Sequence, residues 1–263
     1  MSSQLQGRIA LITGGGTGIG AACARLFAQA GAAVSVMGRR TTPIERVADE
    51  INGLAVQGDA SVEKDCERAV QATIDAYGGL DTLVSCAGIM SEGNVADLSK
   101  SDWDQIIDVN LTSVMLIARA AIPAMRRRSN GAIVNIASLG ALFAPGNMAG
   151  YISSKTALIG LSRSMAVDFG PHIRVNALCP GWVLTPMSEE EMNQFGASKN
   201  ISKQEAIAYA TRFLPLERMA MPEEIAKCAR FLCSDDASFI TGTTLVADGG
   251  SSAVDVGYIS LTS

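Results

Sequence analysis

The sequence predicts a single α/β domain in which a parallel β-sheet is covered by helices on both faces. Short apolar runs alternate with helical patterns along the chain, which is typical of strand–helix–strand units. The apolar runs are nearly continuous, as in strands that are buried on both sides. The chain has 263 residues, of which 48% are apolar and 18% charged, and this is enough for the core of one such domain.

Seven apolar runs are expected to form the strands, at residues 8–13, 33–37, 54–58, 82–88, 132–138, 173–180 and 243–250. Helical patterns lie between them at 20–30, 62–77 and 222–233. The first two end at glycine and the third begins with proline, as helix ends and starts prefer. Residues 184–214 break this rhythm and carry helical stretches of their own, so they are expected to form a substrate loop. No linker or repeat interrupts the domain, which is expected to span 1–263.

Charge and hydropathy exclude several classes of partner. The formal net charge of -5 provides no basic field, so neither nucleic acid nor a membrane surface is an expected partner. The triple-basic run at 126–128 is expected to be the end of a helix, where cations favour the helix dipole. The N-terminus has no apolar stretch behind a basic start, and Arg119 and Pro123 interrupt the best candidate for a membrane span. A cytoplasmic protein is therefore expected.

Cysteine and histidine usage predicts neither a disulfide framework nor a metal site. The six cysteines form no C-x-x-C pair and stand mostly in apolar runs, so they are expected to be buried thiols in a reducing compartment. The only histidine, His172, precedes a strand and is interpreted as an ordinary loop residue. A Ser-His-Asp triad or a His-rich metal centre would need it.

A glycine-rich loop, TGGGTGIG at 13–20, follows the first strand and opens a helix. Glycines let the backbone turn tightly and approach a pyrophosphate, whose charge meets the N–H groups at the positive end of the helix. The strand–loop–helix context favours a dinucleotide site over a plain turn. Gly14, Gly18 and Gly20 fit the spacing G-x-x-x-G-x-G. The triplet Gly16, Gly18 and Ala21 also fits G-x-G-x-x-A, so the spacing alone leaves the subclass open.

A second cluster follows the fifth strand. Ser138 closes that strand, and Tyr151 and Lys155 stand one turn apart on the next helical segment, so they share a helix face. Ligands of open parallel sheets bind at the carboxyl ends of the strands, so the three side chains are expected to converge beside a coenzyme. A hydroxyl, a phenol and an ammonium can move one proton while a coenzyme moves a hydride. Each residue alone would be ordinary in a strand end, a core edge or a solvated helix.

These motifs, together with SCAG at 85–88, VNLTS around Asn110 and PGWVLT at 180–185, resemble the short-chain dehydrogenase/reductase family. Their order and spacing match over essentially the whole chain, from Gly7 to Gly250, and the joint pattern is far more specific than any single motif. The resemblance implies a Rossmann-type doubly wound parallel sheet of about seven strands. It also implies a homotetramer or homodimer that interconverts an alcohol and a carbonyl with NADP or NAD.

The resemblance assigns the catalytic roles. Tyr151 would be the general acid/base, Ser138 would hydrogen-bond the substrate oxygen, and Lys155 would hold the nicotinamide ribose and lower the tyrosine pKa. Asn110 resembles the helix residue that anchors a water relay to the lysine. A phenol with a pKa near 10 is a poor base at neutral pH, and lowering it by two or three units corresponds to roughly 3–4 kcal/mol of phenolate stabilisation.

The resemblance also assigns the coenzyme contacts. Asp59 resembles the residue that contacts the adenine, and Thr185 matches the position that holds the nicotinamide carboxamide. The expected coenzyme-binding residues are Gly14, Thr17, Gly18, Ile19, Gly38, Arg39, Arg40, Asp59, Ala60, Ala87, Gly88, Asn110, Tyr151, Lys155, Pro180, Gly181, Val183 and Thr185. One departure stands out. Where the family usually has Asn-Asn-Ala-Gly, this chain has Ser85-Cys86-Ala87-Gly88, so a looser cofactor wall with unchanged backbone geometry at Ala87 and Gly88 is expected.

The tip of the second strand reads VSVMGRRT at 34–41 and bears on the choice of coenzyme. In dinucleotide folds an acid at this position accepts hydrogen bonds from the ribose hydroxyls of NAD. Gly38 stands there instead, which leaves room for a 2′-phosphate, and Arg39 can pair with that phosphate through its planar fork. Arg40 adds to the same field or lies in solvent. NADP(H) is therefore predicted, with NAD(H) as the alternative.

Three other functions stay open. A coenzyme-sensing protein without catalysis is disfavoured by the intact set Ser138, Tyr151 and Lys155. Enoyl reduction and sugar-nucleotide epimerisation on the same fold are disfavoured by the Tyr-to-Lys spacing and by the glycine pattern and chain length, respectively.

The substrate is expected to be a small alcohol or ketone. Apolar residues around the site suit an apolar substrate, although core packing would explain several of them equally: Leu139, Leu142, Phe143, Met148, Trp182, Met187, Met192 and Phe195. The tail at 251–263 is expected to reach a neighbouring subunit of a homo-oligomer.

Overall fold

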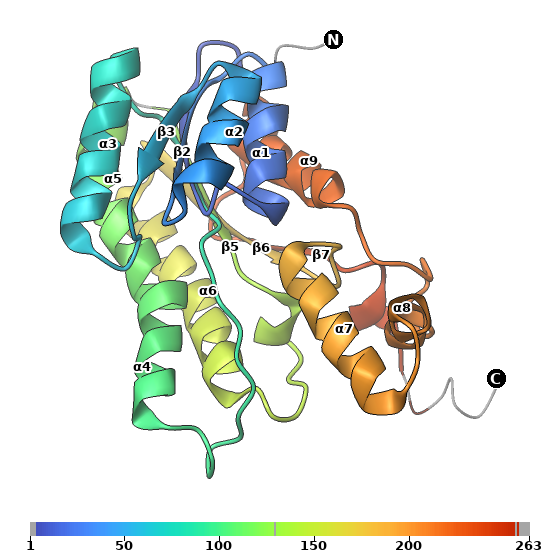
Figure 1. The fold of residues 1–263 in the computed structure, drawn as a ribbon. Coiled ribbons are helices and arrows are strands. Elements are labelled where there is room, and N and C mark those ends of the chain that lie inside the picture. Colours follow the sequence, from blue (N-terminus) through green and yellow to red (C-terminus); the bar gives the residue numbers. More distant parts are fainter. Residues whose placement is uncertain (1–3, 129, 256, 258–263) are drawn as a thin grey trace.

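The computed structural model describes residues 4–128, 130–255 and 257. They form one Rossmann-like domain around a seven-stranded sheet in which every pair of neighbouring strands is parallel (Figure 1). The strand order is β3-β2-β1-β4-β5-β6-β7. The predicted fold class is confirmed, and the strands are β1 (Ile9–Thr13), β2 (Ala33–Gly38), β3 (Leu54–Gln57), β4 (Thr82–Ser85), β5 (Gly131–Ile136), β6 (Ile173–Pro180) and β7 (Thr244–Ala247).

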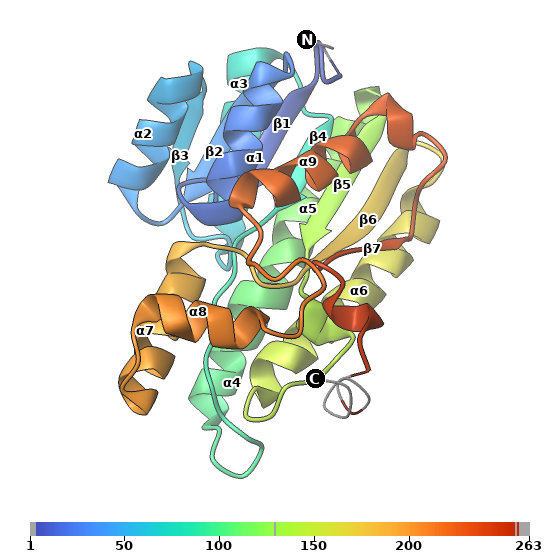
Figure 2. The same cartoon turned by 90° about the vertical axis from the view of Figure 1, so that its right-hand side faces the viewer.

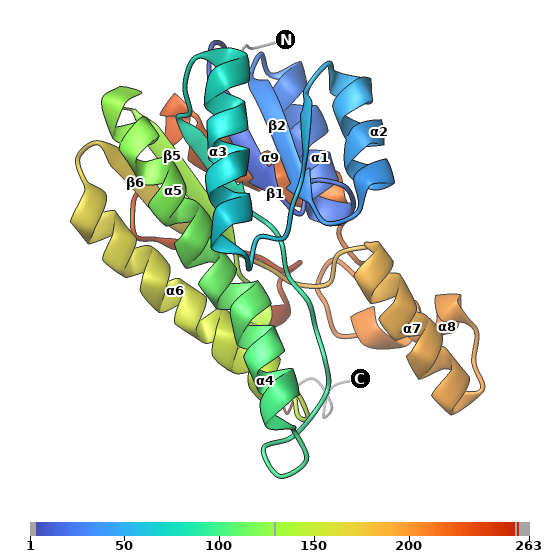
Figure 3. The same cartoon turned by 60° about the vertical axis from the view of Figure 1, so that its left-hand side comes forward.

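Helices cover both faces of the sheet, because successive apolar residues of each buried strand point to opposite faces. In β1, Ala10 and Ile12 belong to one core cluster and Leu11 to another. The first cluster packs under α1 (Gly18–Gln29), α2 (Thr41–Ile51) and α9 (Pro222–Cys233), which lie together in Figure 2. The second packs under α3 (Glu63–Tyr77), α5 (Ser113–Arg128) and α6 (Ala149–Phe169), which cover the face seen in Figure 3.

One long helical segment runs from Lys100 to Arg128. It consists of α4 (Lys100–Ile107), a π-helical turn (Asp108–Thr112) and α5. The expectation that Arg119 and Pro123 keep this run below membrane-spanning length was wrong, because the helical segment continues through both residues. Pro123 stands on the exposed side of α5, where water can satisfy the carbonyl that loses its partner. By length and composition the segment could cross a membrane, but 44% of its apolar window is buried inside the molecule, as in a core helix.

The segment 184–214 forms α7 (Pro186–Lys199) and α8 (Lys203–Thr211), which stand beyond the carboxyl ends of the strands (Figure 2). They enclose a small core of their own around Met192, Ala206 and Met219. Short 3-10 turns occur at Leu139–Ala141, Asp235–Ala237 and Ser251–Ala253. Most of the predicted tail, residues 256 and 258–263, lies outside the described residues, so its reach stays a prediction.

Two smaller expectations are confirmed. All six cysteines are free thiols, four of them buried and two partly buried. The triple-basic run forms the last turn of α5, where Arg128 pairs with the buried Asp81 at 3.0 Å. The carboxylate of Asp81 also accepts from the N–H of Ile9, so this pair ties the start of β1 to the end of α5.

Candidate active site

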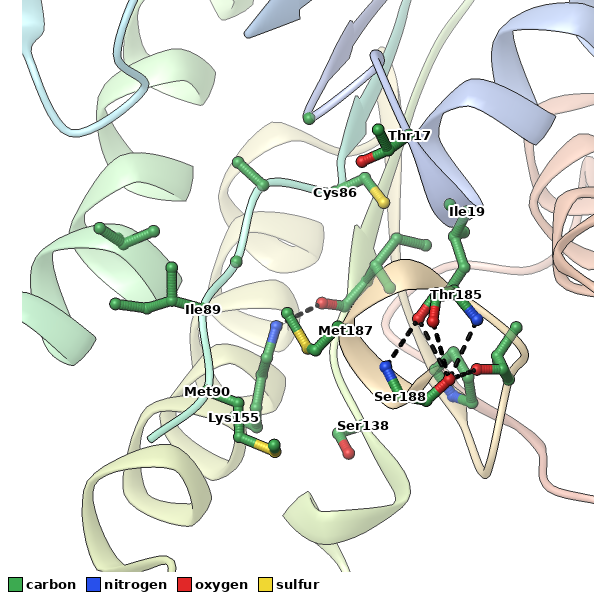
Figure 4. A pocket seen from close by; sticks show the side chains of 18 of the residues that line it. Thr17, Ile19, Cys86, Ile89, Met90, Ser138, Lys155, Thr185, Met187 and Ser188 are labelled. Carbon is green, nitrogen blue, oxygen red and sulfur yellow. Dashed lines mark hydrogen bonds between the residues drawn. The ribbon is translucent and has the colours of Figure 1, made fainter. Parts of the chain in front are cut away.

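A cavity of about 690 Å³ opens at the carboxyl ends of the strands. Its walls come from the loops that follow β1 to β6 and from α7 (Figure 4). Every residue predicted from the sequence for catalysis or coenzyme binding lines this cavity, with the single exception of Asn110. The structure therefore brings together residues that are up to 171 positions apart, from Gly14 to Thr185, at the edge of the sheet where ligands of such folds bind.

The glycine-rich loop owes its composition to two different constraints. Gly14 and Gly18 have positive φ angles, 66° and 52°, which side-chain-bearing residues rarely adopt. Gly20 is needed for space, since a Cβ there would stand 2.3 Å from the carbonyl oxygen of Gly14. The side chain of Thr17, the N-cap of α1, makes no capping bond. The first-turn amides of this helix thus face the cavity without competition from that hydroxyl.

Ser138, Tyr151 and Lys155 meet as predicted. Ser138 follows β5, and its Oγ accepts from the N–H of Gly140 at 3.1 Å. Lys155 donates from Nζ to the carbonyl oxygen of Ile136, the last residue of β5, at 3.0 Å. Lys155 Nζ also lies 5.9 Å from the centre of the Tyr151 ring. Figure 4 shows Ser138 and the anchored Lys155 beside the same part of the cavity.

Burial controls the protonation of this group. Burial raises the pKa of Tyr151 above its ordinary value, against the effect of its hydrogen bond with Ser138, and the charge of Glu191 raises it further. Burial also lowers the pKa of Lys155 to about 8. The pKa of Tyr151 is thus raised where the family resemblance implied a lowered pKa, because in the protein alone removal of the phenol from water outweighs its hydrogen bond with Ser138.

Asn110 stands behind the cavity wall, in the π-helical turn. Its Oδ1 accepts from the N–H of Ile89 at 2.8 Å, and its Nδ2 donates to the carbonyl of Ile89 at 2.9 Å and to Ser154 Oγ at 3.1 Å. Ser154 in turn donates to the carbonyl of Tyr151 at 2.7 Å. Asn110 is therefore a positioning residue between the loop after β4 and the helix that carries Tyr151. The sequence reasoning missed Ser154, although its position beside the tyrosine was a usable signal.

The wall that follows β4 is held by hydrogen bonds from both sides in spite of Ser85 and Cys86. Thr13 Oγ1 accepts from the N–H groups of Cys86 and Ala87 at 3.1 and 3.3 Å. A Cβ on Gly88 would lie 3.3 Å from Asn110 Oδ1 and 3.5 Å from Lys155 Nζ, so this glycine lies against the catalytic group. Thr13 was also missed, because its role depends on the pairing of β1 with β4 rather than on a local motif.

The tip of β2 presents an exposed cation to the cavity. The side chain of Arg39 is largely exposed, and its Nη1 lies 4.0 Å from Oδ2 of Asp59. Asp59 holds its own loop, since its Oδ1 accepts from the N–H and the hydroxyl of Ser61 at 2.9 and 2.7 Å. Ala60 follows it in the same wall, and Arg40 caps α2 without a side-chain bond. A Cβ on Gly38 would approach only the end of the Ile44 side chain, at 2.9 Å.

The loop after β6 leads into α7. Gly181 donates its N–H to Ala247 at 3.0 Å, and Val183 pairs with Ala220, so the loop is fixed to neighbouring segments. Thr185 caps α7: its N–H donates to Ser188 Oγ at 3.0 Å and its Oγ1 accepts from the N–H of Ser188 at 3.4 Å (Figure 4). The hydroxyl of Thr185 therefore has a helix-capping role in the protein alone.

The apolar residues expected around the substrate divide into two groups. Leu139, Phe143, Met148, Trp182 and Met187 line the cavity. Met192 and Phe195 instead pack in the small core between α7 and α8, and Leu142 is exposed outside the cavity lining. The structure adds one acid that the sequence reasoning missed, Glu191 on α7, which shares the lining with these apolar side chains.

Comparison with known proteins agrees with this geometry. Residues 14–252 match a family model that is described as Enoyl-(Acyl carrier protein) reductase. Protein MoaE of Klebsiella aerogenes is 42% identical over 251 residues, which cover 95% of this chain and 97% of that protein. Dehydrogenase/reductase SDR family member 4 of Sus scrofa is 36% identical over 256 residues, which cover 95% of this chain and 88% of that protein.

Two solved structures share the whole fold. Ligand-free aldohexose dehydrogenase (AldT) of Thermoplasma acidophilum superposes with a TM-score of 0.91 at 33% identity, covering 97% of this chain and 98% of that chain. Levodione reductase superposes with a TM-score of 0.90 at 31% identity, covering 95% of this chain and 100% of that chain. The described sheet and helices therefore belong to a fold that these two chains share over nearly their full length.

Proposed function

The chain belongs to the short-chain dehydrogenase/reductase family, and from this premise we propose that it interconverts a secondary alcohol and a ketone with NADP(H). Oxidoreductases of this family act on small molecules and generally use a nicotinamide coenzyme. The observation that carries the proposal is the meeting of Ser138, Tyr151 and Lys155 in the large cavity at the carboxyl edge of the sheet.

The residues of the cavity fit a dinucleotide. The loop at 14–18 brings backbone N–H groups to the cavity. The hydroxyl of Thr17 makes no capping bond to α1, so it is available to bind a phosphate. Asp59 and Ala60 would border the adenine, Ala87 and Gly88 the ribose, and residues Pro180 to Thr185 the nicotinamide end. The coenzyme, when bound, accepts or supplies the hydride.

The side chains of this protein would handle the proton. Ser138 would hydrogen-bond the substrate oxygen, and Tyr151 would remove the hydroxyl proton of an alcohol or protonate the oxygen of a ketone as it is reduced; both residues line the cavity. Burial raises the pKa of Tyr151, so in the protein alone the phenol holds its proton at neutral pH. The ammonium of Lys155, which Ile136 holds in place, would stabilise the phenolate when alcohol is oxidised.

The strand tip supports NADP(H) over NAD(H). The lining of the cavity at this end contains Gly38 where NAD-specific folds have an acid, and Arg39 stands in the lining with much of its side chain exposed. A guanidinium can bind a 2′-phosphate through two parallel hydrogen bonds. Asp59, 4.0 Å from Arg39, balances part of this charge, which would keep NAD(H) as a second coenzyme.

The substrate class, an alcohol or a ketone, is part of the same proposal. The two similar structures are an aldohexose dehydrogenase and a levodione reductase, and their names refer to a sugar and to a ketone. The matching family model is described as an enoyl reductase. The spacing of four residues from Tyr151 to Lys155 instead favours carbonyl reduction, because enoyl reductases of this fold resemble a wider spacing. A coenzyme sensor without catalysis would not need the three side chains together.

One screen tests the proposal. Purified protein is mixed with NADPH or NADH and a panel of alicyclic, aryl and acyl-thioester ketones together with one 2-enoyl thioester, and coenzyme oxidation is followed by the absorbance of the reduced nicotinamide. Turnover of at least one ketone that depends on Tyr151 is the expected result. Turnover of the enoyl thioester alone, or coenzyme binding without any turnover, would overturn it.

A further inference from the structure

Glu191 places a carboxylate in the lining of the cavity. It lies on α7 four residues after Met187, so both side chains stand on one face of the helix, and both line the cavity. The same cavity is lined by large apolar side chains, among them Phe143, Met148 and Trp182. Glu191 is partly buried, which is costly for a carboxylate without a partner.

The two preceding acids of α7 show how unusual this position is. Glu189 pairs with Lys203 at 2.9 Å, and Glu190 accepts from Gln194 at 2.9 Å on the exposed side. Within the described parts of the chain, no side-chain hydrogen bond or ion pair engages the carboxylate of Glu191. The third acid in a row is thus the one that turns inward.

The charged surroundings of Glu191 add to its need for a partner. Burial raises the pKa of Glu191, and the charge of Glu92, on the loop after β4, raises it further. Asn147 donates to Glu92 at 3.3 Å, so the loop before α6 holds that acid in place. The cations in the lining are engaged elsewhere: Lys155 is bound to Ile136, and Arg39 and Arg40 stand at the other end.

Glu191 shares its cavity with the reacting group. Ser138, Tyr151 and Glu191 all line it, and the charge of Glu191 adds to the effect of burial in raising the pKa of Tyr151. A substrate whose oxygen meets Ser138 and Tyr151 would therefore occupy the same cavity as this carboxylate. Glu191 is not among the predicted coenzyme contacts, so its carboxylate is available to the substrate.

We propose that Glu191 binds a hydrogen-bond donor of the substrate, so that the preferred substrates are ketones and alcohols with a second hydroxyl or a protonated amine. This inference rests on the proposed function and narrows its substrate class. A donor that reaches Glu191 supplies the bond that the protein does not, and an ammonium adds charge pairing. A carboxylate on the substrate would be repelled by Glu191 and Glu92 together.

The test compares matched ketones that differ only in the second group: cyclohexanone, 4-hydroxycyclohexanone and 4-aminocyclohexanone. Specificity constants, kcat/KM, are measured for the wild type, Glu191→Leu and Glu191→Gln, with Glu190→Gln as the control on the exposed side of the same helix. Coenzyme titration and melting temperature show that each variant is folded.

The wild type should prefer the hydroxy and amino ketones to cyclohexanone. Glu191→Leu should reduce both preferences about tenfold or more, because a buried hydrogen bond to a charged group is lost. Glu191→Gln separates the two donors: it should keep most of the hydroxyl preference and lose the amine preference. Glu190→Gln should leave the ratios as they are.

Ratios that stay within about threefold of the wild type in Glu191→Leu, or that change equally in Glu190→Gln, would overturn the inference while leaving the proposed function in place. An absence of Tyr151-dependent turnover with all three ketones, and with the wider panel, would instead overturn the proposed function.

Discussion

The ammonium of Lys155 lies 5.9 Å from the centre of the Tyr151 ring, one turn further along α6. Its Nζ is held by the carbonyl of Ile136 at the end of β5. Both side chains belong to α6, and β5 holds the end of one of them. The distance between the ammonium and the phenol is therefore set by how α6 packs on β5. The reactivity of Tyr151 therefore depends on contacts between β5 and α6 as well as on the residues themselves.

We expect Tyr151→Phe to abolish turnover while coenzyme binding remains nearly intact, because the change removes the proton carrier and keeps the ring. Loss of general acid/base catalysis typically costs about a hundredfold or more. Steady-state kinetics and a coenzyme titration measure the two effects. Tyr209→Phe is the matched control, since Tyr209 is an exposed residue of α8. Activity within about tenfold of the wild type in Tyr151→Phe would contradict the mechanism.

We expect the stability of the wild type to rise relative to Lys155→Met between about pH 8 and pH 10. The folded-state pKa of Lys155 is lowered to about 8, whereas an unfolded lysine titrates near 10.4. In this window the unfolded chain binds the extra proton, so raising the pH favours the folded wild type, by roughly 1–3 kcal/mol in total. Below pH 8 both states are protonated and the difference between the proteins should be constant.

Urea unfolding at pH 7, 8, 9 and 10 measures this difference. Lys64→Met removes a positive charge from an exposed position and controls for net charge. Free energies of unfolding for wild type and Lys155→Met that run parallel from pH 8 to 10 would show that Lys155 titrates as a solvated lysine.

We expect the wild type to prefer NADPH to NADH in kcat/KM, and the double variant Gly38→Asp with Arg39→Ile to shift toward NADH. The aspartate would accept from the ribose hydroxyls and repel a 2′-phosphate, and the arginine that pairs with this phosphate is lost. Gly38→Ala measures the steric effect alone, since a Cβ there meets the end of the Ile44 side chain. Arg40→Ile tests whether the neighbouring cation contributes.

A wild-type preference for NADH, or a ratio that does not move in the double variant, would mean that these arginines do not recognise a phosphate. A shift in Gly38→Ala as large as that in the double variant would assign the effect to shape rather than to charge.

We expect two glycine-to-alanine changes in helices to act in opposite directions. Gly20→Ala should lower both stability and coenzyme affinity, because the Cβ would stand 2.3 Å from the carbonyl oxygen of Gly14. Gly160→Ala, inside α6, has open space around its Cβ and should stabilise the protein by about 0.5–1 kcal/mol through the helix propensity of alanine. Thermal unfolding and coenzyme titration compare the pair, and an unimpaired Gly20→Ala would contradict the packing argument.

We expect a homo-oligomer at micromolar concentration, as is common in the family. Val167 at the end of α6 and Phe239 before β7 are large apolar side chains that stand in solvent in the single chain. Sedimentation velocity gives the mass, and Phe239→Glu should weaken assembly. Val95→Glu, at another exposed apolar position, is the control. A monomeric mass for the wild type would contradict this expectation.

The sequence predicts the site best where its signals are local. The glycine loop, the Tyr151–Lys155 pair and the strand tip at Arg39 are short motifs whose order along the strands determines where they meet. All seven strands and the helix from Pro222 to Cys233 were likewise predicted, since hydrophobic period and helix-start chemistry are local properties.

The missed features depend on contacts between distant segments. Thr13 supports the wall after β4 only because β1 and β4 are neighbours in the sheet. Glu191 turns inward only because α7 lies over the cavity, which neither its period nor its charge reveals.

The π-helical turn at Asp108–Thr112 has a consequence for recombination between relatives. A π turn holds one residue more than an α turn, so it rotates α4 by about 100° relative to the phase that α5 alone would set. This phase allows Asn110 to face Ile89 while α4 packs against α6. Chimeras that join α4 and α5 from different relatives should therefore keep the extra residue of this turn, or the amide of Asn110 will rotate away from the site that it supports.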